Sequence, residues 1–413
     1  MKWMIGKTKP PRIREILDYV MLYLLLLSTS GFYFHSHIHA YIIPLGIGIV
    51  WCFFSGMKVN KTLFSVTVLL CFNILLSAML NDDDLKSIFL AWAAVIGALL
   101  IVSSHDFEWF ANSYCKLMAA LSAFSIICYI IELFSPGLLA NKFPLFQDNG
   151  RSAYYGIGAF VPPVSVWHAP RNQSIFWEPG TFQIFLIIAI VLDSALKFQN
   201  FKKRIIVYAI AVLTTLSSTG IIALFLATFI VLNDANQEKQ FKSIRVLSLF
   251  LLVIPVLYEF FMLLPQDMTN NTFEKIADTL SGNTNNMSVS DRMAALSVAW
   301  SSFISSPIYG VGVKGMERFK VLYSTDIMTF TPGRWFANYG IISGILYNAG
   351  FSRILSPLYR SRVCNIAIAV LMMLIISSEA VTTNTAIIVF VMYGLVDIKN
   401  PKQINNTNQE ISA

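Results

Sequence analysis

Charged residues are scarce in this chain. Asp, Glu, Lys and Arg make up 13% of its 413 residues, whereas hydrophobic residues make up 56%. A soluble domain usually carries about 25% charged residues, and here the apolar residues are grouped in blocks of membrane-spanning length. The shortage of charge excludes a water-facing globular surface and predicts a polytopic integral membrane protein.

Cysteine is also rare, and the common cofactor motifs are missing. None of the five cysteines lies in a long polar loop or in a CxxC pair, so we predict no disulfide and no zinc site. The chain has no nucleotide-binding loop, no GxSxG elbow and no dinucleotide-binding fingerprint, so we expect no cofactor. The net charge of +7 is interpreted as a signal of membrane orientation, and we expect no nucleic acid as a partner.

The apolar residues form twelve segments separated mostly by short polar loops. A transmembrane α-helix needs ~20 residues, so the pattern predicts an all-α fold with about twelve transmembrane helices. Residues 217–220 leave two interpretations open, either two spans joined by a tight outer turn or one broken re-entrant element. The twelve segments are 17–34, 40–56, 62–80, 86–102, 112–134, 177–196, 204–217, 219–232, 244–264, 335–352, 362–378 and 380–397.

The positions of Lys and Arg indicate how the chain is oriented. If the N-terminus is inside, the short outer loops contain Lys86 beside the acidic run Asp82–Asp84, and most other basic residues of the loops are inside. This distribution follows the positive-inside rule and predicts that both termini are cytoplasmic. The basic N-terminus and the apolar stretch from Tyr19 to Phe34 are interpreted as an uncleaved first span.

Two connections are much longer than the others, and both fall on the outer, periplasmic side. The first is rich in Gly, Pro and aromatic residues, and the second contains a helical pattern over 290–302 with Met293, Leu296, Ala299 and Trp300 on one face. Long ordered loops are where functional sites are commonly found. We therefore divide one membrane domain into helices at 1–134, a first loop at 135–176, helices at 177–264, a second loop at 265–334, helices at 335–397 and a tail at 398–413.

One stretch of the first loop combines three chemically useful features. Residues 171–180 read Arg-Asn-Gln-Ser-Ile-Phe-Trp-Glu-Pro-Gly. Glu178 and Pro179 predict an N-cap followed by proline in the first helical turn, so the positive end of the helix dipole would face outward. Arg171 can bind phosphate and Glu178 can accept a proton. From these residues alone, a phosphate site and a simple capping carboxylate beside a lipid-facing arginine are equally open.

An arginine followed by aromatic-Glu-Pro-Gly before a span resembles the Wzy-type O-antigen polymerases and, more loosely, the O-antigen ligase-like superfamily. Further similarities are the layout of spans and loops, the run Ser217–Gly220, and Ser306-Pro307 with Gly310 and Gly312. The family pattern of an arginine in each large outer loop maps onto Arg171 and Arg292. The spacing from Arg171 to Gly180 is shorter than in some members. The resemblance implies a fold like that of GT-C-type membrane glycosyltransferases.

The resemblance also implies site residues. Arg292 would bind a lipid diphosphate at headgroup depth, with an ordinary interfacial helix as the alternative. The ligases carry a histidine where this chain has Asn338, which favours a polymerase. An interfacial aromatic belt is an alternative for Trp335 and Tyr339. The substrate contacts expected in addition to the catalytic Arg171, Glu178 and Arg292 are Arg151, Gly180, Arg334, Asn338, Tyr339 and Glu379.

The implied activity is that of an O-antigen, or surface polysaccharide, polymerase. It would transfer the growing glycan from undecaprenyl diphosphate onto an incoming undecaprenyl-diphosphate-linked repeat unit, at the periplasmic face of the bacterial inner membrane. The transfer would be inverting and independent of metal because arginines bind the diphosphate, and Glu178, or else Glu379, would accept the proton. The implied partners are the lipid-linked donor and acceptor, membrane lipid and a chain-length regulator protein.

Two other functions remain open. An O-antigen ligase would transfer the finished polymer to the lipid A core. A flippase for lipid-linked oligosaccharides should have related halves and short loops on both faces, which the two long outer loops contradict.

Three further groups of polar residues lie near the outer ends of spans or in outer loops. We expect Glu132 and Glu259 to be solvated at the membrane interface. His35, His37 and His39 would share one face of an extended loop, which is a weak metal pattern. The run Asp82–Asp84 would either hold a divalent cation or form a solvated outer turn. We predict no metal site.

Overall fold

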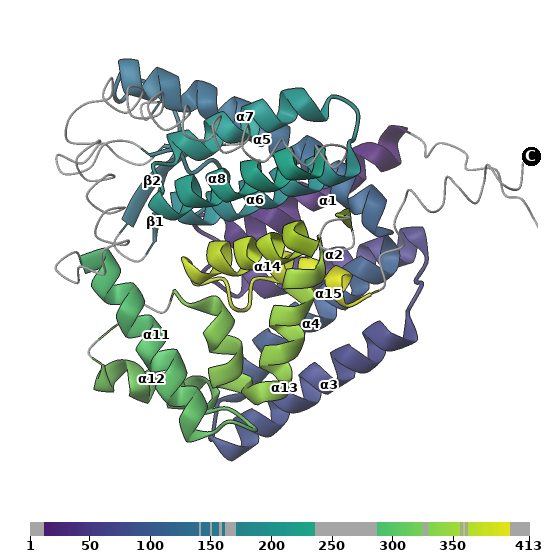
Figure 1. Ribbon diagram of the computed structural model, residues 1–413, viewed down its shortest axis with the longest axis vertical. Helices are drawn as coiled ribbons and strands as arrows, with labels where there is room; N and C mark the ends of the chain where they lie inside the picture. Colours follow the sequence, from purple (N-terminus) through teal and green to yellow (C-terminus); the bar gives the residue numbers. More distant parts are fainter. Residues whose placement is uncertain are drawn as a thin grey trace, which may run out of the picture.

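The computed structural model describes residues 12–139, 142–148, 151–156, 159–161, 171–235, 287–323, 325, 329–355, 358–359 and 362–396. The predicted span at 244–264, the basic residues before Arg12 and the tail at 398–413 lie outside this described part. Within it the chain forms thirteen helices and one small sheet (Figure 1). The helices are α1 Arg12–Ser30, α2 His39–Ser55, α3 Lys61–Leu80, α4 Leu85–Ser104, α5 Phe107–Phe134, α6 Pro179–Leu196, α7 Phe201–Thr214, α8 Ser218–Ala235, α11 Met287–Ser305, α12 Gly312–Leu322, α13 Thr331–Arg353, α14 Arg362–Ser377 and α15 Thr385–Leu395.

Short polar residues determine where several of these helices begin. A side-chain oxygen at the N-cap accepts a hydrogen bond from an amide of the first turn, which otherwise has no partner inside the helix. Proline stands in the first turn of α6 and of α13, where its missing N–H costs nothing. The side-chain caps are Asn60 for α3, Asp84 for α4, Asp106 for α5 and Asn384 for α15.

The described part contains four helices that are long and apolar enough to cross a membrane, namely α3, α4, α5 and α6. Helices α2, α14 and α15 and most of α8 are also apolar but shorter. Phe64, Phe72 and Phe89 on α3 and α4 are each more than half exposed, as expected for side chains that face lipid. The structure is consistent with a helical membrane protein, and the number of twelve spans remains a prediction.

Helix α6 lies at the centre of the bundle. It packs against α5, α7, α8 and α14 (Figure 1), and every residue from Gly180 to Ala195 is buried. The apolar side chains of α6 are thus covered by its neighbouring helices. The N-terminus of α6 therefore lies inside the protein, and the residues that precede it are brought among the ends of other helices.

Contacts between helix ends follow the alternation expected of successive crossings. The amide of Trp177, just before α6, donates to the carbonyl of Ser30 at the end of α1 (2.8 Å). On the opposite side, the amide of Lys58 donates to the carbonyl of Ser103 (2.8 Å). Each contact joins two connections that the predicted topology assigns to the same side of the membrane.

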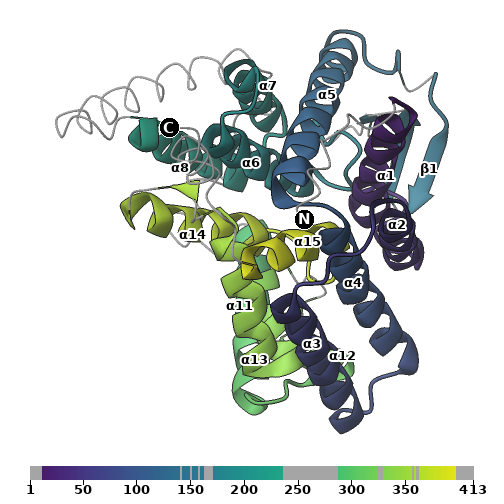
Figure 2. The same cartoon turned by 90° about the vertical axis from the view of Figure 1, so that its right-hand side faces the viewer.

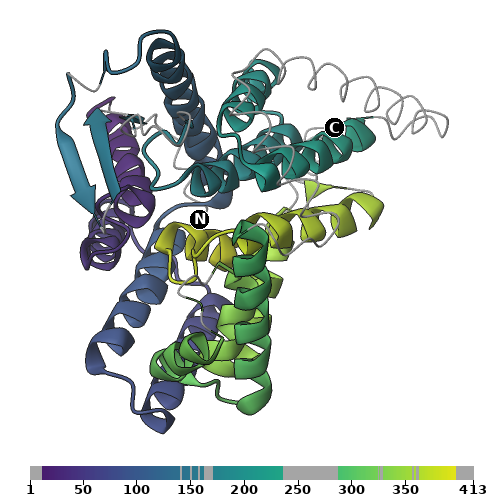
Figure 3. The same ribbon diagram turned by 90° about the vertical axis from the view of Figure 1, so that its left-hand side faces the viewer.

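The first long loop contains a three-stranded antiparallel sheet that the sequence analysis did not predict. Its strands are β1 Leu145–Asp148, β2 Arg151–Gly156 and β3 Ala159–Val161, in the order β1-β2-β3. Leu145 pairs with Tyr154, and Tyr154 with Val161. The sheet lies beside α1 and α2 (Figures 2 and 3), and the rings of Tyr33 and Phe146 are 6.1 Å apart. It adds a small β element to an otherwise helical protein.

The second long loop contains the predicted helix and one more. Helix α11 begins three residues before the predicted start at 290 and packs against α12 and α13. Met293, Leu296 and Trp300 are exposed, but Ala299 is buried, so the prediction that it shares their face is wrong. The buried face is formed by small side chains because α11 lies directly on α13.

Helix α13 is interrupted where a turn of the second loop packs against it. Gly340 has φ 77° and ψ −177°, which breaks the helix. The amide of Ile341 donates to the carbonyl of Pro307 (2.9 Å), and a Cβ added to Gly340 would lie 2.0 Å from the carbonyl oxygen of Ile308. Only glycine combines this φ with such a close approach of another backbone.

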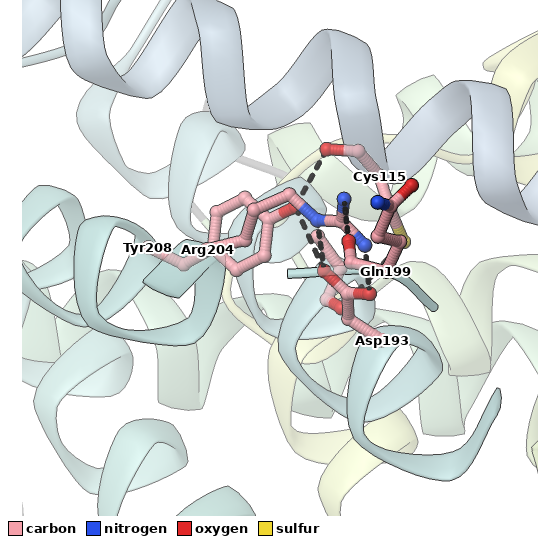
Figure 4. A network of polar contacts seen from close by, with 6 residues as sticks. Cys115, Asp193, Gln199, Arg204 and Tyr208 are labelled. Atoms are coloured by element: carbon pink, nitrogen blue, oxygen red, sulfur yellow. Dashed lines mark hydrogen bonds and ion pairs between the residues drawn. The ribbon is translucent and has the colours of Figure 1, made fainter. Parts of the chain in front are cut away.

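A buried ion pair joins α6 to α7 at the end of α6 opposite to Glu178. Arg204 donates to both carboxylate oxygens of Asp193, from Nε at 2.6 Å and from Nη2 at 2.5 Å (Figure 4). Its Nη1 donates to the carbonyl of Gln199 (2.8 Å). The hydroxyl of Tyr208 donates to the carbonyl of Cys115 on α5 (2.5 Å). A bidentate arginine–carboxylate pair orients both groups, so the network fixes how α5, α6 and α7 meet.

We expect Asp193→Ala to destabilise the protein by about 3–5 kcal/mol, because it leaves the Arg204 guanidinium largely buried beside no counter-charge. Thermal unfolding of the purified chain in detergent measures the effect. The control is Lys320→Ala, which removes the partner of the exposed Glu317 carboxylate and should cost about 0–1 kcal/mol. Equal unfolding temperatures for the two variants would contradict the prediction.

Candidate functional site

The segment at residues 171–178 is anchored to neighbouring helices before α6 begins. The amide of Asn172 donates to the carbonyl of Thr214 (3.0 Å). Its side-chain Nδ2 donates to Oγ1 of Thr214 (2.9 Å) and to Oγ of Ser125 (3.2 Å). Phe176 is fully buried and stacks on Phe182 of α6, with ring centroids 5.2 Å apart. The end of the first long loop is therefore a packed part of the bundle, held by α5, α6 and α7.

Arg171 is bound to the end of α7. Its Nε donates to the carbonyl of Thr215 (2.9 Å), and its Nη2 donates to the carbonyl of Leu216 (3.1 Å). These carbonyls belong to the short turn between α7 and α8, so residues 204–232 form two helices joined by a tight turn. The C-terminal end of a helix carries partial negative charge, which holds the guanidinium in place. A guanidinium has five N–H donors, so these two contacts leave the Nη1 edge for other groups.

Glu178, Pro179 and Gly180 start α6 as predicted, with Glu178 at the N-cap and Pro179 in the first turn. The Glu178 side chain, however, makes no capping hydrogen bond to its own helix. Beside it lies the carboxyl of Glu379, which comes from the connection between α14 and α15. A Cβ added to Gly180 would lie 1.6 Å from Oε1 of Glu379 and 2.6 Å from its Cδ. Gly180 is therefore the residue that makes room for Glu379 at the N-terminus of α6.

The backbone of Glu379 is fixed by α13. Oγ1 of Thr331, the first residue of α13, donates to the carbonyl of Glu379 (2.6 Å) and accepts from the amide of Val381 (3.0 Å). Nε1 of Trp335, one turn later, donates to the carbonyl of Thr382 (2.9 Å). The start of α13 thus holds the connection that carries Glu379, and Glu379 itself is buried.

Four charged residues interact at this point. Burial raises the pKa of the Glu379 carboxyl well above its ordinary value; the charge of Glu178 and a hydrogen bond with Glu178 raise it further, while Arg292 and Arg171 lower it. Burial lowers the pKa of Arg171, and Glu178 and Glu379 oppose that effect. Opposite charges this close favour each other's ionised forms. Arg171, Glu178 and Arg292 therefore all lie within electrostatic range of Glu379, and we call these four residues the four-charge cluster.

Arg334 and Tyr339 lie on α13, outside the four-charge cluster. Arg334 is within electrostatic range of Tyr339, Glu317 and Tyr41, a set of neighbours separate from those of Glu379. Tyr41 also bonds through its hydroxyl to Oγ1 of Thr383 (2.9 Å). Tyr41 thus links this group to the connection between α14 and α15, which also carries Glu379.

The interpretation of Trp335 and Tyr339 as an interfacial aromatic belt is wrong, because both are buried. Trp335 stacks on Tyr347, with ring centroids 4.6 Å apart. Asn338 is also buried, and its carbonyl accepts from Oγ of Ser77 on α3 (2.6 Å). These residues pack the interrupted part of α13 against its neighbours.

The expectation that Glu132 is solvated is also wrong. Glu132 is 2% exposed, and its carboxylate accepts from the amides of Gly137 (2.6 Å) and Leu139 (3.3 Å), so it stabilises the turn after α5. Glu259 lies outside the described residues. Arg151 is the first residue of β2, but its side chain is outside the described part.

The histidines near the start of α2 do not form the predicted extended loop. Residues 32–38 form turns. His35 stacks on Trp177, with ring centroids 4.6 Å apart, and His37 stacks on Tyr33 at the same distance. Their roles in the structure are therefore packing roles beside the segment that precedes α6.

The acidic run after α3 caps two helices. The carboxylate of Asp83 accepts from the amides of Val313 and Lys314 at the start of α12 (both 2.8 Å). Asp84 accepts from the amide of Ser87 at the start of α4 (2.8 Å). In the described part of the chain, no group of three or more His, Cys, Asp and Glu residues is placed to hold a metal ion. Asp83 instead attaches the second long loop to the turn between α3 and α4.

Four long apolar helices and a charged cluster at the ends of several helices define a helical membrane protein with a polar site. A family model described as O-antigen ligase (Wzy_C) matches residues 204–347. The matched segment contains Arg292 and Arg334, whereas Arg171, Glu178 and Glu379 lie outside it. Comparisons with curated proteins and with solved structures gave no significant match. The family match supports the O-antigen ligase/polymerase superfamily, and thus a membrane enzyme of surface-polysaccharide biosynthesis; it does not distinguish polymerase from ligase.

Two contributions to the site were not predicted from the sequence. One is Thr331, although a Thr-Pro pair at the start of a helix is a recognisable signal. The other is the role of Gly180, which was predicted to bind substrate but instead leaves space for the side chain of Glu379. No local sequence pattern predicts the contact between Gly180 and the Glu379 carboxyl, because the two residues are far apart in the sequence.

Proposed function

We propose that this protein is a surface-polysaccharide polymerase of the O-antigen type. It transfers the growing glycan from undecaprenyl diphosphate onto an incoming undecaprenyl-diphosphate-linked repeat unit, at the periplasmic face of the inner membrane. The family match supports the broader class, and the specific activity is our proposal.

The observation that carries the proposal is that Arg171 and Arg292 both lie within electrostatic range of the Glu379 carboxyl. The two arginines come from the two long connections that the predicted topology assigns to the periplasmic side. An arginine stays ionised and can form two parallel hydrogen bonds to a phosphate. The N-terminus of α6 adds the positive end of a helix dipole at the same place. A lipid diphosphate is the substrate group that such a site would bind.

The chemistry needs little beyond these groups. The acceptor hydroxyl attacks the anomeric carbon of the donor glycan, the bond from that carbon to the phosphate oxygen breaks, and the electron pair stays on the diphosphate. Arg171 and Arg292 stabilise the charge that builds on the leaving diphosphate. A carboxylate of the four-charge cluster accepts the proton of the hydroxyl. Attack in a single step inverts the anomeric carbon.

A ligase is the second candidate, because the matching family is described as O-antigen ligase. A ligase would use the same donor and the same leaving diphosphate. It would differ in the acceptor, which would be the lipid A core instead of a lipid-linked repeat. The four-charge cluster would serve either reaction, so the acceptor must be identified by experiment.

The test is polymerisation by the purified full-length protein in lipid, with a defined undecaprenyl-diphosphate-linked repeat as both donor and acceptor and with a chelator present. We expect a ladder of products longer than one repeat, because both substrates are supplied and the arginines take the place of a metal. The control replaces the repeat with the free oligosaccharide, which lacks the diphosphate leaving group. Absence of any ladder, with transfer to added lipid A core instead, would overturn the polymerase and favour the ligase.

The same distinction can be made in cells. Deleting a polymerase should leave lipopolysaccharide with the core plus one repeat, whereas deleting a ligase should leave the core alone. A flippase deletion should leave no repeat at the surface.

A further inference from the structure

Glu178 and Glu379 have an arrangement that helix capping does not explain. Glu178 occupies the N-cap of α6, where an acidic side chain usually accepts from amides of the first turn, yet it makes no such bond. Its side chain is instead hydrogen-bonded to Glu379. Glu178 is partly exposed, whereas Glu379 is buried. One member of the pair can therefore meet a substrate while the other cannot.

The position of Glu379 is determined from two sides. Thr331 holds the backbone of Glu379 through a 2.6 Å hydrogen bond to its carbonyl. Gly180 leaves the space that its carboxyl fills, since a Cβ there would overlap Oε1. The glycine at position 180 is explained by the need to keep the Glu379 carboxyl against Glu178.

We propose that Glu379 holds a proton and donates a hydrogen bond to Glu178, which stays ionised and acts as the base for the acceptor hydroxyl. In this arrangement Glu178 is the catalytic residue and Glu379 is a positioning residue. The inference rests on the glycosyl transfer proposed above and identifies which carboxylate accepts the proton.

The charges around Glu178 and Glu379 are consistent with a single proton shared by the two carboxyl groups. Two ionised carboxylates in contact repel each other, so one of them keeps its proton. Burial is the main cause that raises the pKa of Glu379, and its hydrogen bond with Glu178 acts in the same direction, which makes Glu379 the donor. Arg171, from the segment before α6, and Arg292, from α11, act on Glu379. Tyr129 of α5 and Arg292 act on Arg171 in turn.

The proton balance of the step is simple. The proton of the acceptor hydroxyl moves to Glu178 as the new bond to the anomeric carbon forms and the bond to the diphosphate oxygen breaks. The proton on Glu379 is not consumed. Its hydrogen bond keeps the Glu178 carboxylate in one orientation, and both protons remain bound until the products leave and Glu178 releases its proton to water.

The test compares Glu178→Gln, Glu379→Gln and Glu379→Ala in the purified full-length protein, with initial polymerisation rates measured over about pH 5–9. We expect Glu178→Gln to lower the rate by about 10²–10⁴-fold, because the base is lost. Glu379→Ala should also cause a large loss. Glu379→Gln should recover much of that loss, since an amide donates a hydrogen bond as a protonated carboxyl does.

The pH dependence of the rate distinguishes a proton-holding Glu379 from a Glu379 that only supports the structure. The wild-type rate should fall as the pH rises through the raised pKa of Glu379, because Glu379 then ionises and repels Glu178. Glu379→Gln cannot ionise, so its rate should not show this alkaline fall. Each variant is first checked for the wild-type unfolding temperature.

Three outcomes would overturn the inference. The first is an active Glu178→Gln, the second is a Glu379→Gln as inactive as Glu379→Ala, and the third is an alkaline fall that persists in Glu379→Gln. If Arg171→Ala is inactive while Glu178→Gln is active, the shared-proton pair fails but the proposed function stands. If the wild-type protein itself forms no polymer from the defined repeat, the proposed function fails.

Discussion

Arg171→Ala is expected to lower the rate of polymerisation by about 10²–10³-fold, the usual cost of removing one preorganised electrostatic donor. The Arg171 guanidinium is held by the carbonyls of Thr215 and Leu216, so it does not need to reorganise when charge develops on the leaving diphosphate. In cells, the variant should be present in the membrane and produce no long glycan chains. The measurement is the initial rate with the defined lipid-linked repeat, together with the surface-polysaccharide ladder.

Two further variants make the result specific. Arg171→Lys keeps the positive charge but loses the two-pronged geometry, and we expect it to retain only part of the activity. Arg318→Ala is the control, because Arg318 is an exposed arginine on α12 in the same loop as Arg292. Wild-type chain lengths in Arg171→Ala would contradict the assigned site.

Gly180→Ala is expected to abolish most of the activity through a single added methyl group. The Cβ of alanine would lie 1.6 Å from Oε1 of Glu379, far inside any allowed contact, so the Glu379 carboxyl must leave its place beside Glu178. Alanine is otherwise a better helix former than glycine, by about 1 kcal/mol. A loss of activity without a loss of thermal stability would therefore identify the displaced carboxyl as the cause.

The matched control is Gly46→Ala in α2, where an added Cβ has no heavy atom within 4 Å. It should leave both the rate and the unfolding temperature close to those of the wild type. The double variant Gly180→Ala with Glu379→Asp should lose less rate than the combined losses of the two single variants predict, because the shorter acid withdraws from the new methyl group. A fully active Gly180→Ala would show that the contact with Glu379 is not needed.

The start of α6 illustrates what a local pattern can predict. Glu178 at the N-cap and Pro179 in the first turn followed directly from the sequence, and the structure has both. The helix in the second loop was also predicted, although it starts three residues earlier, at Met287. These features depend on residues within a few positions of one another, so the sequence contains the information needed to predict them.

The errors have a common physical cause. Glu132 was expected to be solvated, but it accepts two backbone amides of the following turn. An interfacial aromatic belt was one interpretation of Trp335 and Tyr339, but both are buried. Composition identifies a polar or aromatic residue near the end of a span. Whether lipid, water or protein surrounds it depends on which helices pack there, and composition does not contain that information.

The sequence alone determined that this is a helical membrane protein and where most of its helices begin and end, because apolar run length and capping residues are local properties. Only the tertiary structure decided that Arg171 is held by the end of α7, that Gly180 makes room for Glu379, and that Arg292 acts on the same carboxyl group. These contacts join parts of the chain that are distant in sequence. They form because α5, α7, α8 and α14 pack around α6, and that packing brings the polar ends of those helices to one point.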